Sequence, residues 1–91
     1  MIYEITSTKR FKKDVQIAKK RGKDLSKLFT LVTKLANGEE LEVKYRDHTL
    51  SGDYDGYREC HIEPDWLLVY AIYDDCLVLA LNRTGTHSDL F

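Results

Sequence analysis

The run WLLVYAIY, residues 66–73, constrains the fold more than any other part of this chain. Side chains along a strand alternate between the two faces of a sheet. Both faces of this run are apolar, so the strand has to lie inside a sheet rather than at its edge. We expect helices over one face, and either a partner or a partly open surface on the other. One face would carry Trp66, Leu68, Tyr70 and Ile72, and the other Leu67, Val69 and Ala71.

Two amphipathic helices are predicted before this strand. Phe11, Val15 and Ala18 recur at helical spacing in a segment that Ser7 or Thr8 can cap and that Gly22 ends. A second helix is expected between Asp24, its cap, and the stop signal Asn37-Gly38. The two helices should form a hairpin joined by a tight turn. The apolar stripe of the second helix consists of Leu25, Leu28, Val32 and Leu35.

Strand patterns surround the helices. A short strand is expected over residues 2–6, and three more over residues 57–62, 66–73 and 76–83, after a polar, turn-rich segment. Asp74-Asp75 predicts a tight hairpin in which Tyr73 pairs with Cys76 and Trp66 lies opposite Arg83. The Glu63-Pro64 loop should exceed two residues, because proline cannot take a positive φ. The predicted fold is α+β, with helices on one face of a small sheet: a strand, a helical hairpin and a three-stranded antiparallel meander in one domain, residues 1–91.

Length and composition indicate a soluble globular protein. The 91 residues are 43% hydrophobic and 32% charged, enough for one modest core. No apolar run approaches the roughly 20 residues of a membrane span, and no secretory signal begins the chain. A cytoplasmic location is therefore expected, with Cys60 and Cys76 as reduced, half-buried strand thiols.

Charge is divided unevenly along the chain. Residues 1–46 contain 12 Lys and Arg against 6 Asp and Glu, whereas residues 47–91 contain 2 against 9. A basic half can hold a polyanion through phosphate contacts, or it can be a merely solvated helix face. The residues concerned on the first helix are Lys9, Arg10, Lys12, Lys13, Lys19 and Lys20.

All three histidines lie in the acidic half, together with Arg83. RNA carries its own nucleophile, the 2′-hydroxyl, so its cleavage needs proton transfer and stabilisation of a dianionic phosphorane. Histidines suit the first task and a guanidinium the second. His48, His61 and His87 are therefore candidates for proton transfer, Arg83 for charge stabilisation, and Asp65 for orienting a histidine or acting as a base.

Other interpretations of the same residues remain open. The histidines are 13 and 26 residues apart, which matches no short metal-ligand motif, and they can also be unrelated surface residues. Trp66 and Tyr57 can stack on an unpaired base or pack in the core. Phe91 ends a polar tail, where it can dock onto the fold and hold His87 in place.

The segments GYRECHIEPDWLL and RTGTHSDLF closely resemble the YafQ-type toxins of the RelE/ParE superfamily, which belong to bacterial type II toxin–antitoxin systems. The resemblance extends over the whole chain. It implies a metal-independent, ribosome-dependent endoribonuclease that cuts mRNA in the A site and needs no cofactor. It also implies neutralisation by a DinJ-type antitoxin, and binding of operator DNA by the toxin–antitoxin complex.

The functional positions of the family fall on six residues of this chain, with Trp66 beside them as a substrate-binding position. The basic helix face then becomes a candidate contact with ribosomal RNA. The rival hypothesis is a non-catalytic module, either a gyrase poison of the ParE kind or a regulator that binds only antitoxin and DNA. The six residues are His48, His61, Asp65, Arg83, His87 and Phe91.

Overall fold

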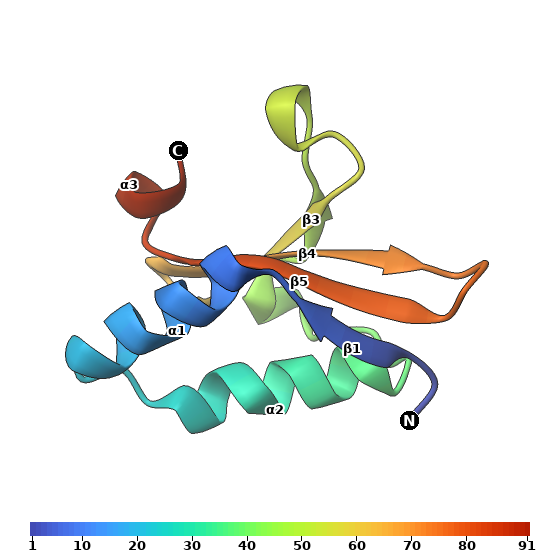
Figure 1. Cartoon of the computed structure of the whole chain (residues 1–91), viewed down its shortest axis with the longest axis horizontal. Helices are drawn as coiled ribbons and strands as arrows, with labels where there is room; N and C mark the ends of the chain where they lie inside the picture. The colour runs from blue at the N-terminus through green and yellow to red at the C-terminus, as the bar shows by residue number, and fades with distance from the viewer.

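The computed structural model describes residues 1–91, and its central feature is a five-stranded sheet with two helices packed on one face (Figure 1). The α+β class is confirmed, and the expected strand, two helices and three strands occur in that order, with a two-residue strand and a short C-terminal helix as unpredicted additions. The bounds are β1 (Glu4–Ser7), α1 (Lys9–Lys20), α2 (Leu25–Ala36), the 3-10 turn η1 (Val43–Tyr45), β2 (His48–Thr49), the 3-10 turn η2 (Gly52–Tyr54), β3 (Arg58–Glu63), β4 (Trp66–Tyr73), β5 (Val78–Gly85) and α3 (His87–Leu90).

The predicted caps set the helix boundaries. The Thr8 hydroxyl accepts a hydrogen bond from the backbone N–H three residues on, at 2.9 Å. The Asp24 carboxylate accepts one from the backbone N–H two residues on, at 3.0 Å. Gly22 and Gly38 follow the two helices with φ of +80° and +76°, a backbone conformation that glycine adopts without steric cost.

The strand order is β1-β5-β4-β3-β2, so the apolar strand β4 lies in the middle of the sheet as predicted. β1 runs parallel to β5, and the other neighbours are antiparallel. The two-residue strand β2 has no counterpart in the sequence prediction, because a two-residue element is too short to show any periodicity.

The predicted register of the β4–β5 hairpin is wrong. Tyr73 lies opposite Val78 rather than Cys76, so the turn has four residues, and β5 begins and ends two residues later than expected. An Asp-Asp pair lacks the glycine or asparagine that a two-residue turn with positive φ requires. The turn instead has one left-handed residue, Leu77, with φ of 52°. A bulge beside Val69 then places Arg83 opposite Val69 and not opposite Trp66.

The loop between β3 and β4 is also shorter than predicted. Glu63 lies opposite Trp66, which leaves only Pro64 and Asp65 in the turn. Neither turn residue has a positive φ, so the objection to proline does not apply. A shift of register between His61 and Glu63 accommodates this geometry.

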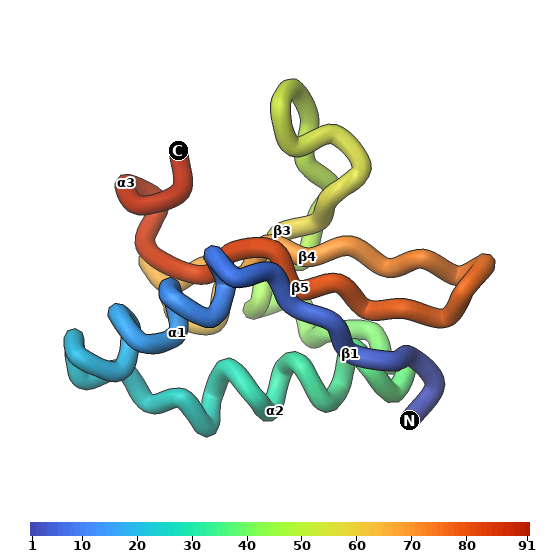
Figure 2. The backbone as a smooth tube through the Cα atoms, viewed as in Figure 1, coloured from blue at the N-terminus to red at the C-terminus, as the bar shows by residue number.

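The two faces of the sheet are covered in different ways. α1 and α2 cover the face of Trp66, Leu68 and Tyr70, where the main core lies. The opposite face, called the second face below, carries Leu67 and Val69 and is covered by the chain itself. Figures 1 and 2 show α3 and the loop between β2 and β3 on this side, away from the helical layer. The covering side chains are Leu50, Tyr54, Tyr57 and Leu90.

No helix of the structure combines the length and apolar character needed to cross a membrane.

Candidate active site

Strand pairing gathers the predicted site residues on the second face. His48 pairs with Glu59, Glu59 with Val69, and Val69 with Arg83, so these four residues form a row across the sheet. His61 lies two residues from Glu59 on the same strand and therefore shares its face. Two inter-strand spacings separate β3 from β5, a distance of roughly 10 Å. His48 and His61 thus lie on one side of an apolar floor, and Arg83 on the other.

A buried carboxylate joins the two histidines. Oε1 of Glu59 lies 3.4 Å from Nε2 of His61 and 3.7 Å from Nε2 of His48. The two imidazole centroids are 6.3 Å apart. The Glu59 side chain is 8% exposed, whereas that of His48 is 49% exposed and can meet a ligand from solvent. Sequence reasoning missed Glu59, although its position two residues before His61 on a strand was a usable signal.

Nδ1 of each of these two histidines contacts a backbone carbonyl oxygen. Nδ1 of His48 lies 2.6 Å from the carbonyl oxygen of Arg46, and Nδ1 of His61 lies 3.3 Å from that of Pro64. A carbonyl can only accept, so Nδ1 carries the proton in each ring. Nε2 of both rings therefore faces the Glu59 carboxylate. This arrangement is suited to general acid–base chemistry.

The C-terminal tail forms the other side of the site. His87 is the first residue of α3, and its ring centroid lies 5.1 Å from that of Phe91. Phe91 in turn lies 5.2 Å from Tyr54, whose hydroxyl donates to the carbonyl oxygen of Leu90 at 3.3 Å. Phe91 therefore docks onto the fold and contacts His87, as expected. Tyr54, which no sequence signal identified, holds the tail in place.

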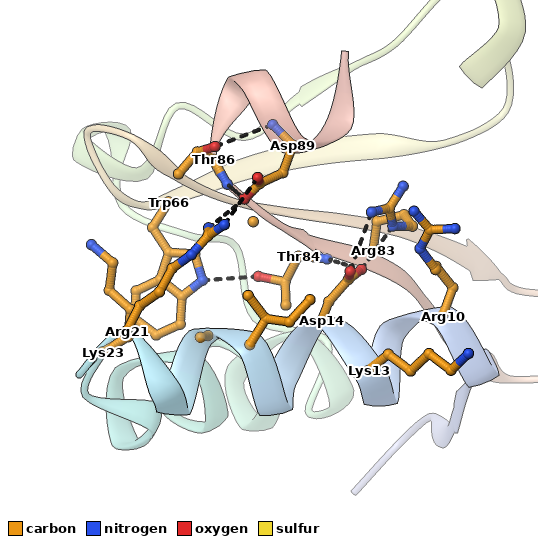
Figure 3. A pocket seen from close by; sticks show the side chains of 13 residues that line it. Arg10, Lys13, Asp14, Arg21, Lys23, Trp66, Arg83, Thr84, Thr86 and Asp89 are labelled. Atoms are coloured by element: carbon orange, nitrogen blue, oxygen red, sulfur yellow. Dashed lines mark hydrogen bonds and ion pairs between the residues drawn. The ribbon is translucent and has the colours of Figure 1, made fainter.

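Arg83 is held by a carboxylate from α1 (Figure 3). Its Nε donates to Asp14 at 2.7 Å and its Nη2 donates to the same carboxylate at 3.2 Å. Both side chains are largely buried, at 15% and 5% exposure. The hydrogen bond with Asp14 raises the pKa of Arg83, so the guanidinium stays charged. A hydrogen bond with Tyr54, on the second face, raises the pKa of Arg83 further, so the guanidinium is held from both sides of the sheet edge.

Asp65 and Trp66 occupy structural positions. Asp65 accepts a hydrogen bond from the backbone N–H of His87 at 3.1 Å, so it holds the start of α3 rather than the imidazole. Trp66 is 1% exposed and donates from Nε1 to the Thr84 hydroxyl at 3.0 Å (Figure 3). Because both ring faces are covered, Trp66 is not accessible to a nucleic-acid base in this structure.

The two cysteines differ in their surroundings. Cys60 is buried in β3, and burial raises the pKa of its thiol to about 12, which keeps it protonated and unreactive. Cys76 is exposed in the β4–β5 turn, so the expectation of two half-buried strand thiols is met by neither. His, Cys, Asp and Glu side chains form no group of three or more arranged to hold a metal ion.

An ion pair ties the tail to α1. Arg21, just after α1, donates to Asp89 of α3 at 2.6 and 3.3 Å (Figure 3). Asp89 also accepts from the backbone N–H of Thr86 at 2.9 Å, while the Thr86 hydroxyl caps α3. A Cβ on Gly85 would come within 2.9 Å of the Asp89 carboxylate, so a residue without a side chain permits this return of the chain.

The basic residues predicted to bind a polyanion lie on the surface of α1. The exposed residues are Lys9, Arg10, Lys12, Lys13, Lys19 and Lys20.

This fold and site define a bacterial toxin of a type II toxin–antitoxin system. The family model described as "Bacterial toxin of type II toxin-antitoxin system, YafQ" matches residues 3–91. The chain is 45% identical over 89 residues to the mRNA interferase toxin YafQ of Escherichia coli K12, covering 97% of this chain and 95% of that protein. The chain belongs to the YafQ family, which confirms the resemblance inferred from its sequence.

Solved structures agree with this assignment. The toxin in the E. coli DinJ–YafQ toxin–antitoxin complex superposes with a TM-score of 0.89 at 43% identity, covering 100% of this chain and 99% of that one. A metal-bound toxin from Helicobacter pylori gives a TM-score of 0.92 at 45% identity, covering 100% of both chains.

The Arg21–Asp89 pair generates a prediction about stability. The hydrogen bond from Arg21 lowers the pKa of Asp89 below the value of about 3.9 expected in the unfolded chain. The stabilisation is therefore complete above about pH 5 and is lost as the pH falls through the folded-state pKa. We expect Asp89→Ala to lower the free energy of unfolding by about 1–2 kcal/mol at pH 7, because a half-exposed pair and a helix cap are lost.

Urea denaturation at pH 7 and pH 3 measures this effect. The difference between Asp89→Ala and the wild type should shrink at pH 3, where the unfolded carboxyl is protonated. Asp75→Ala, an exposed turn residue, is the matched control and should change stability little. An equal loss for Asp89→Ala at both pH values would contradict the assigned role of its charge.

Proposed function

We propose that this protein is an mRNA interferase, an endoribonuclease that cuts mRNA in the ribosomal A site. One observation carries the proposal: three imidazoles and a fixed guanidinium lie on one face of the sheet. His48 and His61 share the Glu59 carboxylate, Arg83 lies across the apolar floor from them, and His87 begins the tail that packs on this face through Phe91 and Tyr54. Cleavage by an internal nucleophile needs one group that accepts a proton and another that donates one, and the paired histidines and the separate His87 supply both.

The proposed reaction begins at the 2′-hydroxyl. One proton-transfer group removes its proton, the 2′ oxygen attacks phosphorus, and the P–O5′ bond breaks as the other group protonates the 5′ oxygen. We assign these two proton transfers to His61 and His87. His48 shares the first transfer, because it contacts the same Glu59 carboxylate as His61. The guanidinium of Arg83 would bind the phosphorane oxygens. Phe91 orders the tail or stacks on a base.

Asp65 enters this scheme as a positioning group. Its hydrogen bond to the backbone of His87 supports placement of the tail, and leaves Glu59 as the carboxylate in contact with imidazole. Neither Trp66 nor a cofactor has a part in the scheme.

His87→Ala tests the assignment. General acid–base catalysis contributes about 10²–10⁴-fold, so we expect cleavage of mRNA on purified ribosomes to fall by at least 100-fold. The His87 side chain is exposed, so thermal unfolding should hardly change. Ser88→Ala, the neighbouring exposed position, should cleave at the wild-type rate. A folded His87→Ala protein with full activity would rule out this role.

Metal independence is a separate prediction. In the proposed mechanism, side chains supply every proton transfer and the charge stabilisation. We therefore expect a toxin that has been treated with EDTA, and is then added to magnesium-containing ribosomes, to cleave mRNA as before. Added zinc or copper should not increase the rate. Activity that disappears with EDTA and returns with one transition metal would show that the mechanism is incomplete.

The partners follow from the family. We propose a DinJ-type antitoxin that neutralises the toxin, a joint complex that binds the operator DNA, and a cytoplasmic location. A gyrase poison or a purely regulatory module has no use for two acid–base clusters on one face. Expression without antitoxin should therefore arrest growth with mRNA cut at defined codons and without DNA damage.

The basic surface of α1 is proposed to hold ribosomal RNA. Each lost phosphate contact lowers the magnitude of the slope of log K against log salt by about 0.7–0.9. We expect Lys12→Gln together with Lys19→Gln to weaken ribosome binding and to reduce this slope by roughly 1.5. Lys34→Gln, on α2, is the control. Unchanged affinity and slope in the double variant would mean that this face is only solvated.

A further inference from the structure

We propose that a basic groove beside His61 binds the phosphate backbone of the mRNA next to the cleavage site; this inference rests on the proposed function. The groove has a volume of about 510 Å³. It lies between α2, η1 and the end of β3, and its wall includes the imidazole of His61. The cations that line it are Lys27, Lys44 and Arg46.

The short length of β2 creates this groove. β2 pairs only with Arg58 and Glu59, so the following residues of β3 have no strand neighbour on that side. The open edge leads from His61, on the second face, toward α2 on the helical face. A strand of RNA whose scissile phosphate lies at the histidines can therefore continue along this edge.

Charge supports an anionic occupant. The acidic half of the chain has only two Lys or Arg residues, and both are paired: Arg83 with Asp14, and Arg58 with Asp47 at 3.3 Å. The cations that share a cavity with His61 are those of the groove, and they come from the basic half of the chain.

Within the groove, Arg46 forms no salt bridge with any carboxylate, and Lys44 reaches only the exposed Glu42, at 3.8 Å. The one acid in the groove, Glu63, is shared by Lys23 and Lys27 at 3.1 and 3.0 Å. The groove therefore has a net positive charge.

The backbone at Arg46 gives independent support. Its φ is 48°, in the left-handed region that costs energy for a residue with a side chain. In this conformation its carbonyl oxygen contacts Nδ1 of His48 at 2.6 Å. One strained residue thus directs a catalytic histidine through its backbone and supplies an unpaired cation to the adjacent groove, which links substrate binding to the proton-transfer cluster.

The test combines protein and RNA substitutions. Cleavage is measured on ribosomes programmed with mRNAs that carry one neutral methylphosphonate at a phosphate flanking the scissile one. Each methylphosphonate follows a 2′-O-methyl nucleotide, which prevents self-cleavage, and the matched reference carries the 2′-O-methyl group with an ordinary phosphate. The proteins are wild type, Arg46→Gln and Lys44→Gln, with Lys34→Gln as a control of equal charge change outside the groove.

We expect Arg46→Gln to lower kcat/KM about tenfold on the reference mRNA, and Lys44→Gln to lower it less. At one flanking position the methylphosphonate should lower wild-type kcat/KM by a similar factor and abolish the further effect of Arg46→Gln. Lys34→Gln should behave as wild type. The Arg46→Gln substitution retains the backbone carbonyl that contacts His48, so kcat at saturation should change less than KM.

Two results would contradict the proposal that the groove binds the mRNA backbone. One is an unchanged kcat/KM for Arg46→Gln, and the other is an effect of Arg46→Gln that persists with every methylphosphonate or equals that of Lys34→Gln. In both cases wild-type cleavage would still support the proposed ribonuclease. Absence of mRNA cleavage by the wild type would instead remove the proposed function, and this inference with it.

Discussion

Burial of β4 on both faces is the constraint on which the rest of the structure depends. The helices cover one side, which leaves Leu67 and Val69 to be covered by something else. Burying two such side chains stabilises the fold by about 1.5–3 kcal/mol each, so chain that reaches them is held there. Leu90 supplies part of the cover, and the segment that contains Tyr54 supplies another part. The apolar requirement of a central strand therefore brings the tail with His87 and Phe91 to the site.

A polar network at the edge of β5 complements this apolar contact. Asp14 accepts hydrogen bonds from the Arg83 side chain and from the backbone N–H of Thr84. The Thr84 hydroxyl accepts from Trp66 and donates to the carbonyl oxygen of Leu67 at 2.7 Å. A buried carboxylate is tolerated only with such partners. Because Asp14 belongs to α1, the network joins the basic helix rigidly to the arginine of the site.

The elements that were predicted correctly have strong local signals. Capping residues, left-handed glycines and helical periodicity identify both helices, and the two apolar faces of residues 66–73 identify the central strand. The missed features depend on contacts that are distant in sequence. Glu59 comes close to His48 only because β2 pairs with β3. The register of the β4–β5 hairpin depends on a four-residue turn and, from Val69 onward, on a bulge. The family resemblance places Trp66 at a substrate-binding position, whereas its place in an apolar run favours the core, where it lies.

The structure shows how the basic and acidic halves of the chain contribute cations around the site. An active site that handles a polyanion needs cations, yet Arg58 and Arg83, the Lys and Arg residues of the acidic half, are both held by aspartates. Under the proposed function, Arg83 is fixed for one phosphate, and the histidines have little positive charge around them to attract RNA. The proposed attraction then comes from the basic half, which contributes α1 beside Arg83 and η1 beside His61. Long-range attraction and local chemistry then depend on different side chains. Each can therefore be altered by substitution without directly removing the other.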